Sequence, residues 1–228
     1  MKSALLRHLL AIVSVAACTH AGAVDLSGPA GMDFHVGRAS MKEMRFRSTL
    51  RQQYDFSCGS AAVATLLTYH YGYPVSEQAV FEQMYLHGDQ QKIRREGFSL
   101  LDMQRYLASQ GFRADGFRLP LQRLADANLP AIVLVSEKGY HHFVVVKGVS
   151  RTRVLLGDPA SGTRAITRAA FESVWTNKLL FVIHDQSKAV AFNHPSDWRV
   201  APAAPLAEGI ERDALSRLTL PKLGPGDF

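Results

Sequence analysis

The sequence lacks several features that would assign a function at once. It contains no internal repeat, no coiled-coil heptads and no second hydrophobic cluster large enough for another domain. No His-Glu-x-x-His or paired Cys-x-x-Cys spacing indicates a metal site. These absences favour one globular domain with additional segments at its ends.

Charge of one sign is not concentrated anywhere along the 228 residues. Lys and Arg number 26 against 20 Asp and Glu, so the formal net charge is +6. The densest short basic run, Lys92–Arg95, holds three basic residues and is followed by Glu96. Neither aromatic interleaving nor a DNA-binding motif accompanies the charge, and no nucleic-acid partner is expected.

The N-terminus lacks an apolar run long enough to cross a bilayer. Leu9–Ala17 falls well below the ~20 residues that a membrane-spanning helix needs. Basic residues precede this stretch and Ala21-Gly22-Ala23 follows it, a pattern typical of a cleaved signal peptide. We therefore expect residues 1–23 to be a signal peptide and the exported chain to begin near Val24.

Cysteine is scarce as well, since only Cys18 and Cys58 are present. The segment Val15-Ala16-Ala17-Cys18 also resembles a lipobox, so lipidation at Cys18 is an alternative to simple cleavage and the one case in which membrane attachment is expected. After simple cleavage Cys58 has no cysteine partner. A lone thiol in an oxidising compartment indicates catalysis, while a small buried hydrophobic residue is the structural alternative.

Hydrophobic patterning places helices first and strands second, which predicts an α+β domain with an antiparallel sheet. The expected helices cover 58–71, 76–86, a segment beginning at Ser99, and 168–175, and the expected strands cover 131–135, 142–149, 153–156 and 179–184. The polar segment Leu86–Gly97 has no apolar period and reads as a surface loop or lid.

The predicted domain covers residues 46–185. Residues 24–45 are expected to be an irregular arm, and residues 186–228 a Pro-rich tail, because the last 34 residues hold half of the ten prolines. A helix over 206–218 is expected within that tail.

The first candidate site segment is Gln52–Ser60, which places Cys58 where a helix begins. Unpaired amides at a helix N-terminus favour a thiolate. A backbone N–H there and a nearby glutamine side chain could stabilise an oxyanion. Gly59 is expected to let a substrate backbone approach.

The second and third candidate segments supply a base and a carboxylate. His141 and His142 lie on one predicted strand and must face opposite sides, so only one of them can serve a given site. Asp158, in Gly157-Asp158-Pro159, either shapes a turn or orients that imidazole in a Cys-His-Asp arrangement.

These segments resemble the C39 peptidases, a papain-like cysteine peptidase family known from bacteriocin leader processing. The family has Gln six residues before a Cys-Gly pair and Asp-Pro sixteen residues after the His of a His-Phe-Val strand. Gln52 and Cys58 differ by six here, and His142 and Asp158 by sixteen. The resemblance selects Gln52 over Gln53 and His142 over His141.

The resemblance implies a papain-like fold, with N-terminal helices packed on an antiparallel sheet. It further implies Cys58 as nucleophile, His142 as base, Asp158 as its orienting group, Gln52 as oxyanion-hole residue and no cofactor. Ser57 departs from the family, since many members have Asp there.

The chain is more similar to stand-alone exported members that accompany bacterial functional-amyloid (Fap) secretion systems than to members fused to an ABC transporter, and this resemblance together with the leader implies a periplasmic location. A peptide or secreted-protein substrate is expected, with secretion or amyloid machinery as a further partner. Two alternatives stay open: a catalytically silent peptide-binding domain of the same fold, and a hydrolase or acyl transferase acting on cell-wall peptides.

Overall fold

The computed structural model describes residues 24–27, 33–36, 40–137, 139–184 and 190–201. The chain divides into two units, 1–40 and 41–228. The described part of the first unit is a hairpin of β1 (Val24–Ser27) and β2 (Asp33–Val36), paired antiparallel. The segment expected to be irregular therefore contains two paired strands, and the short helix α1 (Met41–Arg45) follows at the start of the second unit.

Three of the predicted helices form in the first half of the second unit: α2 (Cys58–His70), α3 (Glu77–His87) and α5 (Leu100–Ser109). The predicted N-caps are confirmed. The Ser76 hydroxyl accepts from the Ala79 amide, and Ser99 forms a capping box with Asp102.

The expectation of a loop or lid over Leu86–Gly97 is wrong, because this segment contains the helix α4 (Gln90–Glu96). The Asp89 side chain caps the helix by accepting from the Lys92 amide, and Ile93 is buried. One buried side chain in seven residues gives too little periodicity to be recognised in sequence.

A six-stranded antiparallel sheet follows, in the order β3-β8-β4-β5-β6-β7. The four central strands were predicted: β8 (Leu180–His184), β4 (Ala131–Glu137), β5 (Tyr140–Val149) and β6 (Arg153–Asp158). The two edge strands, β3 (Arg113–Phe117) and β7 (Gly162–Thr167), were missed. Each contains glycine and few apolar residues, so neither carries a strong strand signal.

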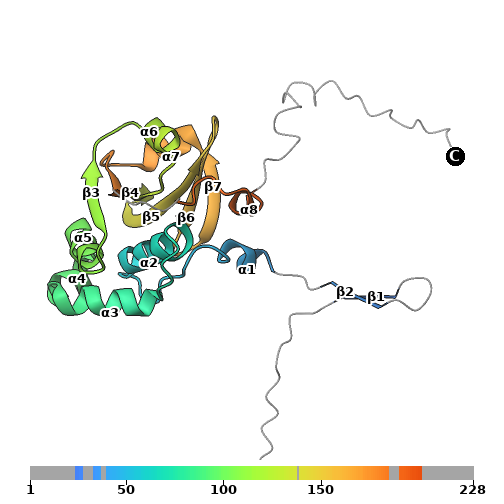
Figure 1. Ribbon diagram of the computed structural model, residues 1–228, viewed down its shortest axis with the longest axis horizontal. Coiled ribbons are helices and arrows are strands. Elements are labelled where there is room, and N and C mark those ends of the chain that lie inside the picture. Colours follow the sequence, from blue (N-terminus) through green and yellow to red (C-terminus); the bar gives the residue numbers. More distant parts are fainter. Residues whose placement is uncertain (1–23, 28–32, 37–39, 138, 185–189, 202–228) are drawn as a thin grey trace, which may run out of the picture. The chain divides into compact units, whose positions relative to one another are not determined.

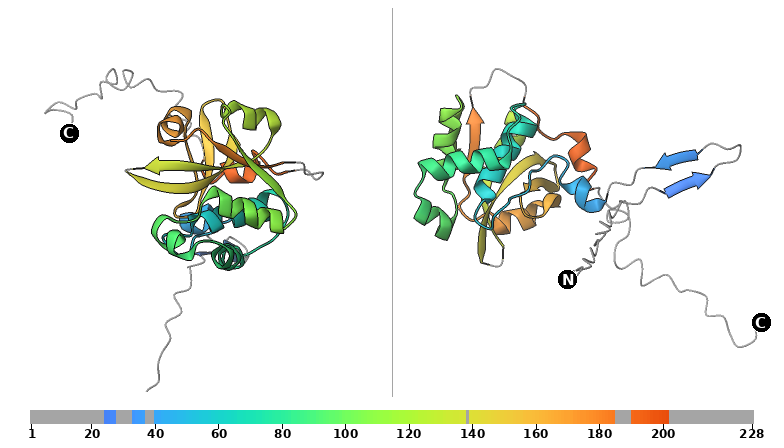
Figure 2. Two further views of the ribbon diagram at one scale, coloured as in Figure 1. Left: turned by 90° about the vertical axis from the view of Figure 1, so that its left-hand side faces the viewer. Right: turned by 90° about the horizontal axis from the view of Figure 1, so that it is seen from below.

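Helices cover both faces of this sheet (Figure 1; Figure 2). Alternate residues of β4 and β5 point into two separate cores. Ile132 and Val145 join the core beneath α2, α3 and α5, whereas Val133 and Val144 join the core beneath α6 (Gln122–Ala127) and α7 (Arg168–Val174). The predicted α+β class with helices packed on an antiparallel sheet is confirmed.

The last described segment, 190–201, contains the short helix α8 (Pro195–Trp198). Pro195 occupies the first turn of this helix, where its missing N–H costs nothing. The helix therefore replaces the extended chain that proline density predicted there. The predicted signal peptide, Cys18, and the predicted helix over 206–218 lie outside the described residues.

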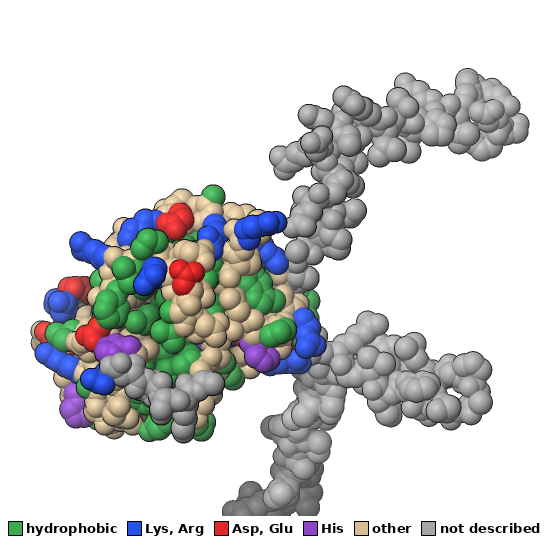
Figure 3. All heavy atoms as spheres, turned by 45° about the horizontal axis from the view of Figure 1, so that its top comes forward, with side chains coloured by type: hydrophobic (Ala, Val, Ile, Leu, Met, Phe, Trp, Pro, Cys, Tyr) green, Lys and Arg blue, Asp and Glu red, His purple; other side chains and the backbone are tan. Residues whose placement is uncertain are grey.

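Two surface properties bear on function. Within the described ranges, none of the helices is long and apolar enough to cross a membrane. On the face drawn in Figure 3, the described Lys and Arg side chains are scattered among hydrophobic and neutral ones and form no continuous basic patch.

Candidate active site

Cys58 is the first residue of α2, and its side chain is almost fully buried. Small side chains let this helix pack deeply, since Ala61, Ala62 and Ala64 are completely buried. The Ser57 hydroxyl bonds to both the amide and the carbonyl of Tyr54, at 3.1 and 3.0 Å, and so fixes the turn before the helix. The thiol is thus presented at a rigid helix N-terminus, where the first amides lack intrahelical acceptors.

Gly59 has a packing role that the sequence did not indicate. A Cβ at this position would lie 2.8 Å from Met103 Cε and 2.9 Å from Phe98 Cβ. The residue therefore faces the α5 side of the core, and the expectation that it admits a substrate backbone is wrong.

His142 lies on β5, and the structure separates it from its neighbour as strand alternation requires. His141 is exposed, whereas His142 is buried with 6% of its surface accessible. The His142 Nε2 atom donates to Asp158 Oδ1 at 2.9 Å. Its Nδ1 atom is buried and has no hydrogen-bond partner among the described residues.

Two acidic groups act on the His142 imidazole and determine its charge. Burial by itself lowers the pKa of His142, but its interactions with Asp158 and Cys58 outweigh burial and raise this pKa to about 9. Asp158 is bound through Nε2, so Nδ1 is the ring nitrogen left for the thiol. At neutral pH the geometry favours an imidazolium beside Cys58.

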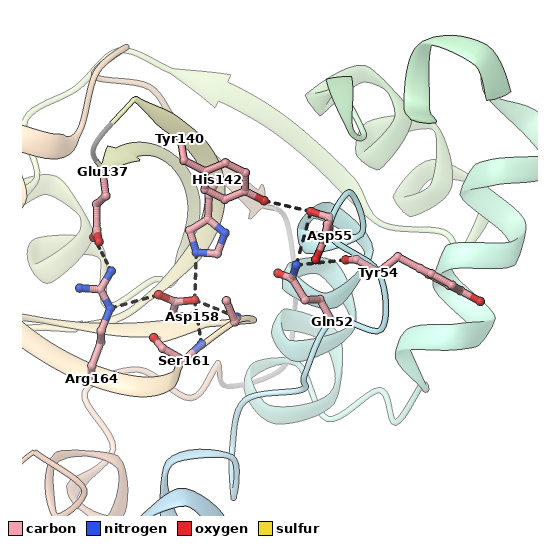
Figure 4. Close-up of polar contacts among 10 residues, drawn as sticks. Gln52, Tyr54, Asp55, Glu137, Tyr140, His142, Asp158, Ser161 and Arg164 are labelled. Carbon is pink, nitrogen blue, oxygen red and sulfur yellow. Dashed lines mark hydrogen bonds and ion pairs between the residues drawn. The ribbon is translucent and has the colours of Figure 1, made fainter. Parts of the chain in front are cut away.

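Asp158 ends β6 in a dense set of donors (Figure 4). Its Oδ1 accepts from His142 and from the amides of Ala160 and Ser161, at 2.9 and 3.2 Å. Burial raises the pKa of Asp158, but the hydrogen bonds and the charge of His142 hold this pKa well below its usual range. The carboxylate both orients the imidazole and stays ionised.

Gln52 lies on the segment that leads to Cys58 and is half-buried, whereas Gln53 is exposed. The Gln52 amide nitrogen donates to the Tyr54 carbonyl at 3.0 Å and weakly to the Asp55 carbonyl at 3.5 Å. Its backbone N–H donates to Pro159 O at 3.1 Å, which fixes this segment to the turn that holds Asp158. The structure thus brings Gln52 and Asp158 into one region.

Three further polar residues border this region and were missed from sequence. The Arg164 Nε atom donates to Asp158 Oδ2 at 3.1 Å, and the Tyr140 hydroxyl donates to the Asp55 carbonyl at 2.9 Å across the site (Figure 4). Buried Glu77 accepts from Ser60 below the first turn of α2, at 2.8 Å. Only Tyr140, two residues before His142 on a predicted strand, had a sequence signal that could have found it.

The residues brought together are suited to nucleophilic catalysis on a carbonyl. A buried thiol at a helix N-terminus lies beside a protonated imidazole that an ionised carboxylate orients. Within the part of the chain that the structure describes, no group of three or more His, Cys, Asp or Glu residues could hold a metal ion.

Comparison with known proteins identifies the family of the chain. The model of the Peptidase C39 family matches residues 47–187. A probable functional amyloid protease FapD of Pseudomonas fluorescens is 37% identical over 176 residues, which cover 77% of each chain. The corresponding protein of Pseudomonas aeruginosa is 43% identical over 147 residues, which cover 64% of this chain and 65% of that protein.

Solved structures agree on the fold. The peptidase domain of Streptococcus ComA, a bifunctional ABC transporter, has a TM-score of 0.51 at 23% identity, with 61% of this chain and 98% of that domain covered. A double-glycine-motif protease from an AMS/PCAT transporter, solved with its leader peptide, has a TM-score of 0.50 at 23% identity, with 60% and 91% covered. From the family match and the two Pseudomonas relatives, the chain belongs to the Peptidase C39 family of cysteine peptidases.

Proposed function

We propose that this protein is an exported cysteine endopeptidase that cleaves a secreted protein or leader peptide, with Cys58 as nucleophile. The observation that carries the proposal is the position of His142, which binds Asp158 through Nε2 and interacts with Cys58 through its charge. This arrangement supplies an imidazolium that can stabilise a thiolate and later donate a proton.

The proposed reaction has two stages. The Cys58 thiolate attacks the peptide carbonyl carbon, and the C–N bond breaks as His142 donates its proton to the leaving amine. Water, deprotonated by the now neutral imidazole, then attacks the thioester and releases the acid and the thiolate. Asp158 holds the imidazole in one orientation throughout.

The oxyanion of each tetrahedral intermediate would be held by the Cys58 backbone N–H and the Gln52 side chain. The Gln52 nitrogen has one good acceptor, Tyr54 O, while its contact with Asp55 O is weak at 3.5 Å. The second N–H, which makes only this weak contact, is the donor that we propose for the substrate oxyanion.

The substrate is proposed from the relatives and the periplasmic location from the N-terminal sequence pattern. Both Pseudomonas relatives are described as probable functional amyloid proteases, which supports a substrate within functional-amyloid secretion for this chain. The mass of the exported protein tests the location, because cleavage after Ala23 and lipidation on Cys18 give different masses. An uncleaved chain would contradict export by this leader.

The activity is tested by incubating the purified exported protein with a library of internally quenched peptides. We expect turnover by the wild type and its loss in Cys58→Ala, with the circular dichroism spectrum unchanged. Turnover by Cys58→Ala at the wild-type rate would overturn the assignment. Peptide binding that is equal in both proteins, without turnover in either, would instead favour a catalytically silent binding domain.

A further inference from the structure

Arg164 is the charged residue in contact with the second oxygen of Asp158. It lies on the edge strand β7, and its side chain is 24% exposed, against 6% for that of Asp158. Its Nε atom donates to Asp158 Oδ2 at 3.1 Å, and its Nη2 atom donates to Glu137 on β4. Figure 4 shows Asp158 between this guanidinium and the imidazole of His142.

The two oxygens of Asp158 have different partners. Oδ1 accepts from His142 and from the amides of Ala160 and Ser161, so three donors fix its position. Oδ2 accepts from Arg164. The backbone turn therefore already orients the carboxylate, and the guanidinium adds a positive charge to it in a place from which water is largely excluded.

That added charge must act on His142 through Asp158. The groups that face the imidazole are Asp158 from β6, Cys58 from α2 and Tyr140 from β5, with a Tyr140-to-His142 centroid distance of 6.0 Å. Asp158 and Cys58 favour the charged imidazole. Two further acidic groups lie one contact away: Asp55 interacts with Tyr140, and Glu137 binds Arg164. Arg164 is the cation bound to Asp158 and Glu137, and its positive charge disfavours a second positive charge on the His142 imidazole.

We propose that Arg164 is a positioning residue that tunes His142: by binding Asp158 Oδ2, it offsets part of the carboxylate charge and lets the imidazolium release its proton to the leaving amine. The proposal rests on the peptidase function proposed above. In this proposal the guanidinium acts electrostatically on His142, and does not serve only as a structural link between β7 and β4.

The two roles predict opposite results when Arg164 is replaced. If Arg164 offsets charge, its removal leaves Asp158 more strongly attractive to the imidazolium, and His142 holds its proton to higher pH. If Arg164 only keeps Asp158 in place, its removal lets the carboxylate move away, and His142 loses its proton at lower pH.

The experiment is an NMR titration of the His142 imidazole in the full chain, comparing wild type with Arg164→Gln. We expect the midpoint to move to higher pH by about half a pH unit or more, as for loss of a nearby charge. Arg168→Gln is the matched control, because it removes the same charge from α7, where Arg168 binds Ser150 O and Gln122. Its midpoint should stay at the wild-type value.

A lowered or unchanged midpoint in Arg164→Gln would overturn the proposal. Arg164→Lys retains a cation beside Asp158 and should give a midpoint between those of wild type and Arg164→Gln. If Arg164→Gln does not fold, a lowered midpoint in Arg164→Lys overturns the proposal in its place.

The titration also separates this proposal from the proposed function, since it does not require turnover. Iodoacetamide labelling of Cys58 in the same proteins reports on the Cys-His pair. Ordinary thiol reactivity in the wild type would count against the peptidase function, while a raised His142 midpoint in Arg164→Gln would still support the link between Arg164 and His142.

Discussion

At the scale of single residues, the two ring nitrogens of His142 have different environments. Nε2 is bound to a carboxylate that four donors surround, whereas Nδ1 has no hydrogen-bond partner of ordinary length among the described residues. This asymmetry fixes the orientation of the ring and leaves one nitrogen for the thiol. Two predictions at the residue scale follow from it.

The first concerns the reactivity of Cys58. An ordinary cysteine loses nucleophilicity as pH falls below about 8.5, because the thiol replaces the thiolate. Beside the His142 imidazolium, Cys58 should react with iodoacetamide faster than the same thiol does in His142→Ala at the same pH. Labelling rates between pH 5 and pH 9 measure the effect, and equal profiles for the two proteins would contradict an activated pair.

The second concerns stability. The pKa of His142 is raised from 6.5 to about 9 in the folded state, so its protonation stabilises the fold fully below pH 6.5, and this contribution is lost as pH rises through 9. The loss is on the order of 3 kcal/mol at most. NMR titration of the His142 imidazole in the folded protein measures this pKa directly, because ionisation of Cys58 has an opposing effect on the pH dependence of unfolding. A midpoint near the ordinary value of 6.5 would refute the raised pKa.

At the scale of elements, the first turn of α2 depends on close contact with α5. Gly59 permits this contact because it has no Cβ to meet Met103 and Phe98. Sequence patterning predicted the helix but assigned Gly59 to substrate approach. A glycine beside a candidate nucleophile looks the same in sequence whether it admits a substrate or allows close helix packing.

Gly59→Ala should therefore destabilise the protein, although alanine is the better helix former. We expect a loss of about 1–3 kcal/mol in the free energy of unfolding, because the added methyl group overpacks the core. Urea unfolding gives the value, and the loss caused by Gly59→Ala should be smaller in a Met103→Ala background, where one of the two contacts is absent. A gain in stability for Gly59→Ala alone would show that α5 can shift to accept the methyl group without loss of stability, and would contradict this prediction.

At the scale of the whole described domain, a buried ion pair joins segment 190–201 to the sheet. Lys147 on β5 is completely buried, and its Nζ atom lies 3.0 Å from Asp197 and 2.6 Å from Ser48 O. Asn193 accepts from the Val149 amide at 2.8 Å. The strand that carries His142 at one end thus holds the last described helix at the other.

Breaking this pair on one side should cost more than removing both charges. Asp197→Asn leaves Lys147 buried without a counter-charge, so we expect a loss of about 3–5 kcal/mol, and addition of Lys147→Met should recover much of it. Glu172→Gln breaks the exposed pair with Lys178 and should change stability by less than about 1 kcal/mol. Chemical unfolding of the wild type and these three variants measures the differences, and a loss for Asp197→Asn no larger than for Glu172→Gln would exclude an essential buried pair.

Much of the candidate site could be predicted from local sequence. The N-caps Ser76 and Ser99 place two helices, because a capping hydroxyl needs only an amide three residues away. Strand alternation separates His141 from His142 by the geometry of the chain itself. The Gln52-to-Cys58 and His142-to-Asp158 spacings suggested the family, which the family comparison then confirmed.

The tertiary structure decided which residues contact one another across separate strands and helices. It placed Arg164 against Asp158, turned Gly59 toward α5 and paired Lys147 with Asp197, a residue fifty positions later. It also added the edge strand β7, whose register comes from pairing with β6 and not from its own apolar pattern. Local spacing fixes which side chains share a face, whereas charge compensation and close packing depend on neighbours that only the folded chain brings together.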